Sequence, residues 1–159
     1  MGRWWRNGVR SLALSPTGEI AGFCYIETWG HGRFVANSGL LVFPAFRRFG
    51  LARAIKGVAF ELSRKKFPEA KLFGLTTSLP VMTINSELGY RPMPFSELTN
   101  DEEFWQGCRG CVNYPILESK SRKNCLCTGM LYDPQWENRS GHSIRILENN
   151  DVSESNPSL

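Results

Sequence analysis

The sequence lacks the long apolar runs and leader patterns that would carry a chain into or across a membrane. No apolar segment reaches the roughly 20 residues that a bilayer-spanning helix needs. The first residues, MGRWWRNGVRS, are charged but contain no apolar core, so they do not fit a secretory signal. Nor do they fit a myristoylation motif, which needs Ser or Thr where the chain has Arg6. We therefore predict a cytoplasmic protein whose five cysteines are thiols or metal ligands rather than disulfides.

A strong charge imbalance, internal repeats and the commonest phosphate-binding motifs are also missing. The 19 basic and 15 acidic residues leave a net charge of +4, and the cations gather locally, at 47–53 and 64–66. This distribution favours a local anion site over the broad basic surface of a nucleic-acid-binding protein. Neither the P-loop nor the dinucleotide fingerprint GxGxxG occurs.

What the sequence does contain is enough hydrophobic material, 42% of 159 residues, for one domain with a real core. Strand patterns occur at 10–15, 20–29, 34–43, 71–77, 90–95 and 123–132, and helix patterns at 51–66, 79–88 and 101–107. Three strands followed by alternating helices and strands indicate a mixed α/β fold, antiparallel at its start and with βα units after it. The polar composition of 135–159 predicts a disordered tail.

Three arginines in PAFRRFGLARAI lie where a helix N-terminus should disfavour them. Arg47, Arg48 and Arg53 flank the first turn of the helix predicted at 51–66, where the macrodipole is positive. Gly50 has no Cβ, so a ligand can approach the backbone closely, and the free amides of the first turn can bind phosphate oxygens. Because arginines add charge-assisted hydrogen bonds, the stretch predicts a cradle for a phosphate or pyrophosphate.

This stretch resembles the signature of the GNAT acetyltransferase superfamily. RRFGLA fits its R/Q-x-x-G-x-G/A pattern, and the resemblance extends over roughly residues 10–95, through LFGLTT and INSELGYRP. It implies a GNAT-like mixed sheet in which the main chain of one strand pairs with the pantetheine arm of acetyl-CoA, while the following loop and helix N-terminus bind the pyrophosphate. Carried over position by position, the acetyl-CoA contacts are Leu40, Leu41, Val42, Arg48, Phe49, Gly50, Leu51, Ala52 and Arg53.

The resemblance implies a GNAT domain over 1–134 that lacks the usual first strand and first two helices, because too few residues precede the first hairpin. In the family those helices form one wall of the acceptor site and cover part of the sheet. We therefore expect an exposed apolar face, covered by Trp4 and Trp5 or by homo-oligomer formation, unless the Cys-rich extension at 96–134 supplies the wall. That extension is similar to a subgroup of small bacterial members.

The choice of catalytic candidates follows from one position at which the chain departs from the family pattern. Many members have a Phe-Tyr pair whose Tyr protonates the leaving thiolate, and the chain has Ile84-Asn85 there. Asn85 cannot act as an acid, although its amide can donate a hydrogen bond to sulfur. Glu27 or His31 is a candidate base for the acceptor amine, directly or through water. The alternatives are a surface carboxylate for Glu27 and a plain turn residue for His31.

Four cysteines form two close pairs, CxxC at Cys108 and Cys111 and CxC at Cys125 and Cys127. If 123–132 is a strand, the second pair points to one side, with the Cα atoms about 7 Å apart. Four thiolates with this reach could bind a tetrahedral Zn²⁺. The alternative is reduced cysteine in the core.

Three functions follow from these observations. The first is an N-acetyltransferase that transfers acetyl from acetyl-CoA to a primary amine of a small molecule or amino acid. The second is a Cys₄ zinc-binding module with a basic face that contacts RNA or protein. The third is a truncated protein that binds CoA but has little activity. We expect no membrane partner and no nucleic acid for the first and third.

Overall fold

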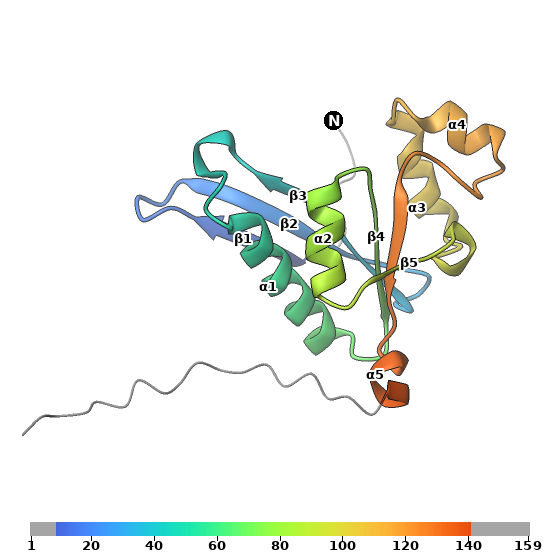
Figure 1. Ribbon diagram of the computed structural model, residues 1–159, viewed down its shortest axis with the longest axis horizontal. Coiled ribbons are helices and arrows are strands. Elements are labelled where there is room, and N and C mark those ends of the chain that lie inside the picture. Colours follow the sequence, from blue (N-terminus) through green and yellow to red (C-terminus); the bar gives the residue numbers. More distant parts are fainter. Residues whose placement is uncertain (1–8, 141–159) are drawn as a thin grey trace, which may run out of the picture.

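The computed structural model describes residues 9–140 as a mixed α/β fold built on one six-stranded sheet (Figure 1). Residues 1–8 and 141–159 lie outside the described part, and so do the predictions for Trp4, Trp5 and most of the tail. The strands are β1 (Val9–Leu14), β2 (Ile20–Trp29), β3 (Phe34–Val42), β4 (Lys71–Thr76), β5 (Arg91–Pro92) and β6 (Thr128–Tyr132). Across the sheet they follow the order β1-β2-β3-β4-β6-β5, and only the β3–β4 pair is parallel. The predicted mixed sheet with an antiparallel start is confirmed.

The helices are α1 (Leu51–Lys66), α2 (Leu79–Glu87), α3 (Glu102–Gln106), α4 (Tyr114–Ser119) and α5 (Gln135–Ser140). Short 3₁₀ turns lie at Pro44–Phe46, Phe95–Glu97 and Gly107–Gly110. Within residues 9–140 no helix is long and apolar enough to cross a bilayer.

Alternation along the strands separates two cores, one on each face of the sheet. Val35 and Leu72 pack in the core under α1 and α2, whereas the next residues, Ala36 and Phe73, belong to the opposite core. The opposite core is closed by residues 95–127, which we call the 95–127 layer and which contains α3 and α4. In Figure 1, α1 and α2 lie over one side of the sheet, and α3 and α4 lie beyond the β4–β6 end.

Helix α1 forms because its apolar residues repeat on one side. Ile55, Ala59 and Phe60 are buried against the sheet at spacings close to the helical repeat. Three basic residues occupy its last turn, where the helix dipole favours cations, and the helix ends before Pro68. The predicted bounds of this helix are confirmed, so the predicted cradle lies at the N-terminus of a regular helix that is packed on the sheet.

The prediction of a last strand at 123–132 is wrong for its first half. β6 begins at Thr128, which pairs with Thr76, the final residue of β4. No strand extends beyond Thr76 to pair with the residues before Thr128, so a strand there would have unpaired backbone groups. Cys125 and Cys127 therefore lie in a loop. No local pattern predicts α4, whose Leu117 is buried in the opposite core.

The prediction of disorder from residue 135 onward is wrong for 135–140, which form α5. The carboxylate of Asp133 accepts a hydrogen bond from the Gln135 amide at 2.9 Å, at the start of this helix. Tyr132 hydrogen-bonds to Glu137, and the Arg91 guanidinium lies 4.5 Å from the centre of the Trp136 ring. These contacts order the chain beyond the sheet despite its polar composition.

An apolar strip remains exposed on the face of the sheet that carries the 95–127 layer. Leu12 faces Phe23, and Phe23 faces Leu41 across the three strands, so these side chains share one face. Leu12 and Leu14 are 52% and 58% exposed. The layer thus covers the β4–β6 half of this face and leaves part of the β1–β3 half open. The expectation that homo-oligomers cover it stays a prediction.

Candidate active site

A gap opens between the two parallel strands in the middle of the sheet. β3 and β4 are in register only from Phe34 opposite Lys71 to Ala36 opposite Phe73, although β3 continues to Val42 and β4 to Thr76. Beyond these pairs the two strands no longer pair with each other, so the edges that face the gap have no strand partner. Such an edge can pair with an extended ligand.

A β-bulge turns β3 away from β4 at this point. Between the pairs Phe23–Leu41 and Tyr25–Ser38, β3 has one residue more than β2. Gly39 lies in this bulge with a φ of +64°, and a Cβ there would lie 2.6 Å from Cδ2 of Tyr25. Only glycine fits both the conformation and the space.

The predicted cradle lies where β3 runs into α1. Gly50 is the N-cap of α1 with a φ of +75°, and no side chain caps the helix, so its first amides have no side-chain partner. Arg48 also has a positive φ, +69°, which is uncommon for a residue with a Cβ. A loop that exposes helix amides beside arginines is suited to anions.

A cleft of about 680 Å³ joins the gap to the cradle. All predicted acetyl-CoA contacts line it except Phe49, whose side chain is 82% exposed and lies outside the lining. The lining consists of Leu40, Leu41, Val42, Phe46, Arg47, Arg48, Gly50, Leu51, Ala52, Arg53, Ser78, Pro80, Val81 and Ile84. This volume is within the usual range for small-molecule and cofactor sites.

The start of α2 also borders the cleft, which the sequence did not predict. Ser78 caps α2 by accepting a weak 3.5 Å hydrogen bond from the Val81 amide, and Pro80 lies in the first turn. The N-termini of both α1 and α2 thus border one cavity. Their dipoles add to the positive potential there. Residues 78–81 carry no motif, so their position is visible only in the fold.

The three arginines of the cradle are not equivalent. The Nε of Arg47 donates to the carbonyl of Val42 at 2.9 Å. Arg53 makes a two-pronged ion pair with Glu87 at 2.7 and 2.8 Å. This hydrogen bond raises the pKa of Arg53 and lowers the pKa of Glu87. Arg48 has no hydrogen bond or ion pair within residues 9–140, so its whole guanidinium is available to an incoming anion.

The predicted donor Asn85 lies apart from the cleft. It is only 2% exposed, and its Nδ2 donates to the sulfur of Met130 at 3.6 Å, while its Oδ1 has no partner within the described chain. Its neighbour Ile84 lines the cleft instead. The sequence placed Asn85 on the right helix but could not indicate its direction, because that depends on β6, which follows β5, α3 and α4 in the chain.

The predicted base Glu27 lies at the level where β3 and β4 separate. Its carboxylate accepts a 2.7 Å hydrogen bond from the hydroxyl of Ser38, next to the bulge, and it is half-buried on the face opposite α1. His31, in contrast, is exposed in the β2–β3 turn with a φ of +59°. That turn adjoins the paired ends of β3 and β4, so His31 lies at the closed end of the gap.

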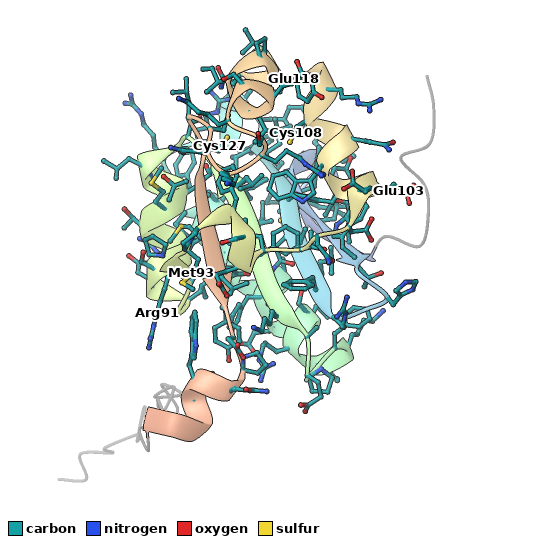
Figure 2. The ribbon with its side chains drawn as sticks, turned by 90° about the vertical axis from the view of Figure 1, so that its right-hand side faces the viewer. Arg91, Met93, Glu103, Cys108, Glu118 and Cys127 are labelled. Atoms are coloured by element: carbon teal, nitrogen blue, oxygen red, sulfur yellow. The ribbon has the colours of Figure 1, made fainter. Side chains whose placement is uncertain are left out.

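The four paired cysteines surround one small cavity of about 30 Å³, together with Leu75 of β4. Cys108 and Cys127 lie near each other in Figure 2. Burial raises the pKa of both thiols. Within the described residues, however, no three His, Cys, Asp or Glu side chains are arranged to hold a metal ion, so the geometry gives no support to the zinc prediction.

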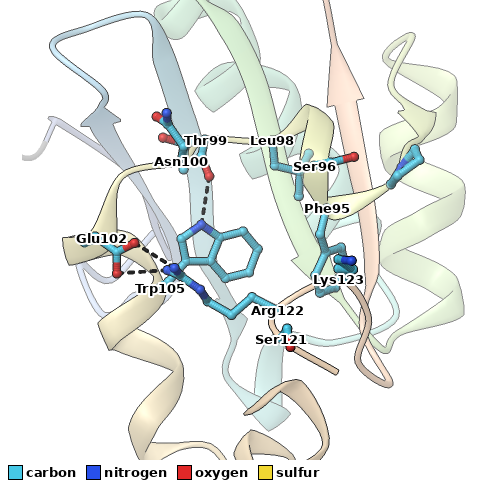
Figure 3. A pocket seen from close by; sticks show the side chains of 11 residues that line it. Phe95, Ser96, Leu98, Thr99, Asn100, Glu102, Trp105, Ser121, Arg122 and Lys123 are labelled. Atoms are coloured by element: carbon cyan, nitrogen blue, oxygen red, sulfur yellow. Dashed lines mark hydrogen bonds and ion pairs between the residues drawn. The ribbon is translucent and has the colours of Figure 1, made fainter. Parts of the chain in front are cut away.

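A second cavity, of about 480 Å³, lies within the 95–127 layer (Figure 3). Trp105 lines it and donates from Nε1 to the carbonyl of Thr99 at 2.8 Å. At its rim, Arg122 and Glu102 form an exposed two-pronged ion pair at 2.7 and 2.9 Å. This cavity shares no lining residue with the cleft, and the sequence did not predict it.

Comparison with known proteins finds similar folds among solved structures but no similar sequence. No protein-family profile and no curated sequence matches the chain. Among solved structures, a GNAT-family acetyltransferase from Staphylococcus aureus Mu50 is similar at a TM-score of 0.57 and 11% identity, with 80% of this chain and 69% of the other covered. An acetyltransferase from Bacillus subtilis in complex with CoA is similar at 0.53 and 13%, with 79% and 76% covered.

A third similar structure is the GNAT-superfamily phosphinothricin acetyltransferase from Sinorhizobium meliloti in complex with AcCoA, at a TM-score of 0.51 and 13% identity. The coverage is 77% of this chain and 58% of that one, so the chain spans little more than half of its length. The chain therefore has the fold of the GNAT acetyltransferases. The cleft and cradle described above occupy the position that the sequence signature RRFGLA indicated.

Proposed function

We propose that the chain is an acetyl-CoA-dependent N-acetyltransferase that acts on a primary amine of a small molecule or amino acid. The observation that carries the proposal is the cleft between the separated strands, which ends at uncapped helix amides and at the unpaired Arg48. An extended thioester cofactor with a pyrophosphate needs both an open strand edge and an anion site.

In this proposal the pantetheine arm lies along Leu40, Leu41 and Val42 on the open edge of β3. The pyrophosphate lies on the amides from Gly50 to Arg53, with Arg48 as the charged partner. Arg53 joins it only by giving up part of its ion pair with Glu87. The residues taken from the signature thus remain the proposed acetyl-CoA contacts. Arg53 is partly engaged by Glu87, and Phe49 lies outside the cleft.

The chemistry requires little beyond positioning. The amine nitrogen attacks the thioester carbonyl, the carbon–sulfur bond breaks, and CoA leaves as a thiolate that takes up a proton. Glu27 accepts the proton lost by the amine, directly or through water, because its carboxylate lies where the strands separate. The role predicted for Asn85, donation to the leaving sulfur, requires its amide to leave Met130.

Isothermal titration calorimetry with acetyl-CoA, followed by a thiol-release assay over a panel of small amines and amino acids, tests the proposal. We expect acetyl-CoA to bind with one site per chain, and at least one amine to be converted to its N-acetyl amide in step with the release of free CoA thiol. Absence of CoA binding would reject the proposal. Binding with no turnover on any amine would favour a CoA-binding protein of little activity, which the exposed apolar strip on the Glu27 face also favours.

A further inference from the structure

A lysine is buried beneath the point where β3 and β4 separate. Lys56 of α1 is 2% exposed, and its Nζ donates to the main-chain carbonyl of Asn37 at 2.6 Å. It also lies 5.7 Å from the centre of the Tyr90 ring. Buried lysines usually have an acidic partner, but within residues 9–140 no carboxylate pairs with Lys56. Such burial carries a cost and calls for a physical reason.

Asn37 is the residue immediately beyond the last β3–β4 pair, and each of its polar side-chain atoms is engaged. Ser63 of α1 donates to its Oδ1 at 2.9 Å, and its Nδ2 donates to the hydroxyl of Tyr90 at 3.3 Å. Together with the Lys56 bond, these contacts tie Asn37 to α1 and to the chain after α2.

The Asn37 carbonyl, which accepts from Lys56, is the group that would accept the next hydrogen bond from β4 if the ladder continued. The parallel ladder opens with the Lys71 amide donating to the carbonyl of Arg33. Bonds in a parallel ladder recur every second residue on each strand, so continuing it places the Leu75 amide opposite the Asn37 carbonyl. The registered pairs stop at Ala36, one residue before Asn37. Lys56 therefore occupies the acceptor that would extend the ladder and close the gap.

We propose that Lys56 is a positioning residue that holds β3 apart from β4 and so keeps the acetyl-CoA cleft open. The proposal rests on the proposed function. Burial lowers the pKa of Lys56, but a neutral amine is still a hydrogen-bond donor, so the clamp does not require the charge. Lys56 does not line the cleft and has no direct part in the reaction.

The test replaces Lys56 with a residue of similar length that has no donor, Lys56→Met. Without the amine, the Asn37 carbonyl becomes free to accept from Leu75, and the ladder extends into the cleft. We expect the Leu75 amide to exchange with solvent about tenfold more slowly in the variant than in the wild type, measured by NMR without ligand. We also expect the Kd for CoA to rise about tenfold and the KM for acetyl-CoA to rise with it, while kcat changes little.

The matched control is Ser11→Ala. Ser11 is buried like Lys56 and also bonds α1 to the sheet, through the carbonyl of Ile55 at 3.1 Å, but it does so on β1. We expect Ser11→Ala to lower stability and to leave both Leu75 exchange and CoA affinity unchanged. Should Lys56→Met fail to fold, Ser63→Ala frees Oδ1 of Asn37, and we expect a rise in Kd of about threefold.

Unchanged Leu75 exchange and unchanged CoA affinity in a folded Lys56→Met protein would overturn the clamp, and so would an unchanged Kd in Ser63→Ala. The two proposals fail separately. A wild-type protein that does not bind CoA rejects the function, whereas Leu75 exchange decides the clamp without any ligand.

Discussion

The half of the molecule formed by β1–β4, α1 and α2 is built by different means from the 95–127 layer. In the first half, long strands and a sixteen-residue helix create a cleft whose residues are exposed or half-buried, apart from Ile84. In the layer, helices of five and six residues have little stability of their own and are held by buried side chains such as Trp105 and Leu117. We therefore expect substitutions in the cleft to affect binding and substitutions in the layer to affect folding.

The largest effect is expected in the layer. Trp105 is 6% exposed and packs on Phe95 and Phe104, so Trp105→Ala should lower the free energy of unfolding by about 3–5 kcal/mol. Urea denaturation measures this, with the exposed neighbour Gln106→Ala as the control, expected within about 0.5 kcal/mol of the wild type. CoA affinity of the folded fraction should not change. A large loss of affinity would show that the two halves are not separate.

Gly50→Val should act in the opposite way. Valine at a φ of +75° is strained, and its side chain occupies the space beside the α1 amides where the proposal puts pyrophosphate. We expect CoA affinity to fall by more than about a thousandfold, or roughly 4 kcal/mol, by calorimetry. Gly18→Val is the matched control, because Gly18 has a similar φ of +85° and equally open surroundings in the β1–β2 turn. Equal affinities in the two variants would remove the cradle from the cofactor site.

Glu27→Gln should separate chemistry from binding within the first half. The amide keeps the size of the carboxylate and can still accept from Ser38, but it cannot take a proton. We expect kcat to fall about a hundredfold while the Kd for acetyl-CoA is unchanged. The comparison of kcat with Kd distinguishes a base from a structural role, since loss of a structural contact would also weaken acetyl-CoA binding or lower stability. A variant with wild-type kcat would show that another group accepts the proton.

The smallest effect is expected from breaking an exposed ion pair. Arg53–Glu87 beside the cleft and Arg122–Glu102 in the layer have the same two-pronged geometry and can be compared. Glu87→Gln should free Arg53 for the pyrophosphate and tighten CoA binding about threefold, because both partners are exposed and the pair is weak. Glu102→Gln breaks the Arg122 pair in the layer and should leave binding unchanged. Titration calorimetry at low and high salt checks both. Weaker binding in Glu87→Gln would mean that Glu87 positions Arg53 rather than competing for it.

The sequence predicted the parts of the fold that depend on local signals. The helix at 51–66 and its cradle could be located because glycine, arginines and the apolar repeat all lie within one short stretch. The start of β6 could not, because it depends on where β4 ends, some fifty residues earlier, and strand partners are not local. The same limit applies to Arg53, whose partner Glu87 lies on another helix, and to Asn85, whose direction depends on β6.

The burial of Lys56 has a consequence for protein modification. Acetyl-CoA is a reactive thioester that acylates free amines, and a lysine with a lowered pKa is more often in the nucleophilic, neutral form. Lys56 lies behind the strand proposed to bind this thioester, yet its amine is enclosed and engaged by Asn37, whereas Lys65 and Lys66 of the same helix are exposed. An acetyl group on Lys65 or Lys66 therefore reports exposure to acetyl-CoA alone. An acetyl group on Lys56 records that the helix and the sheet had come apart.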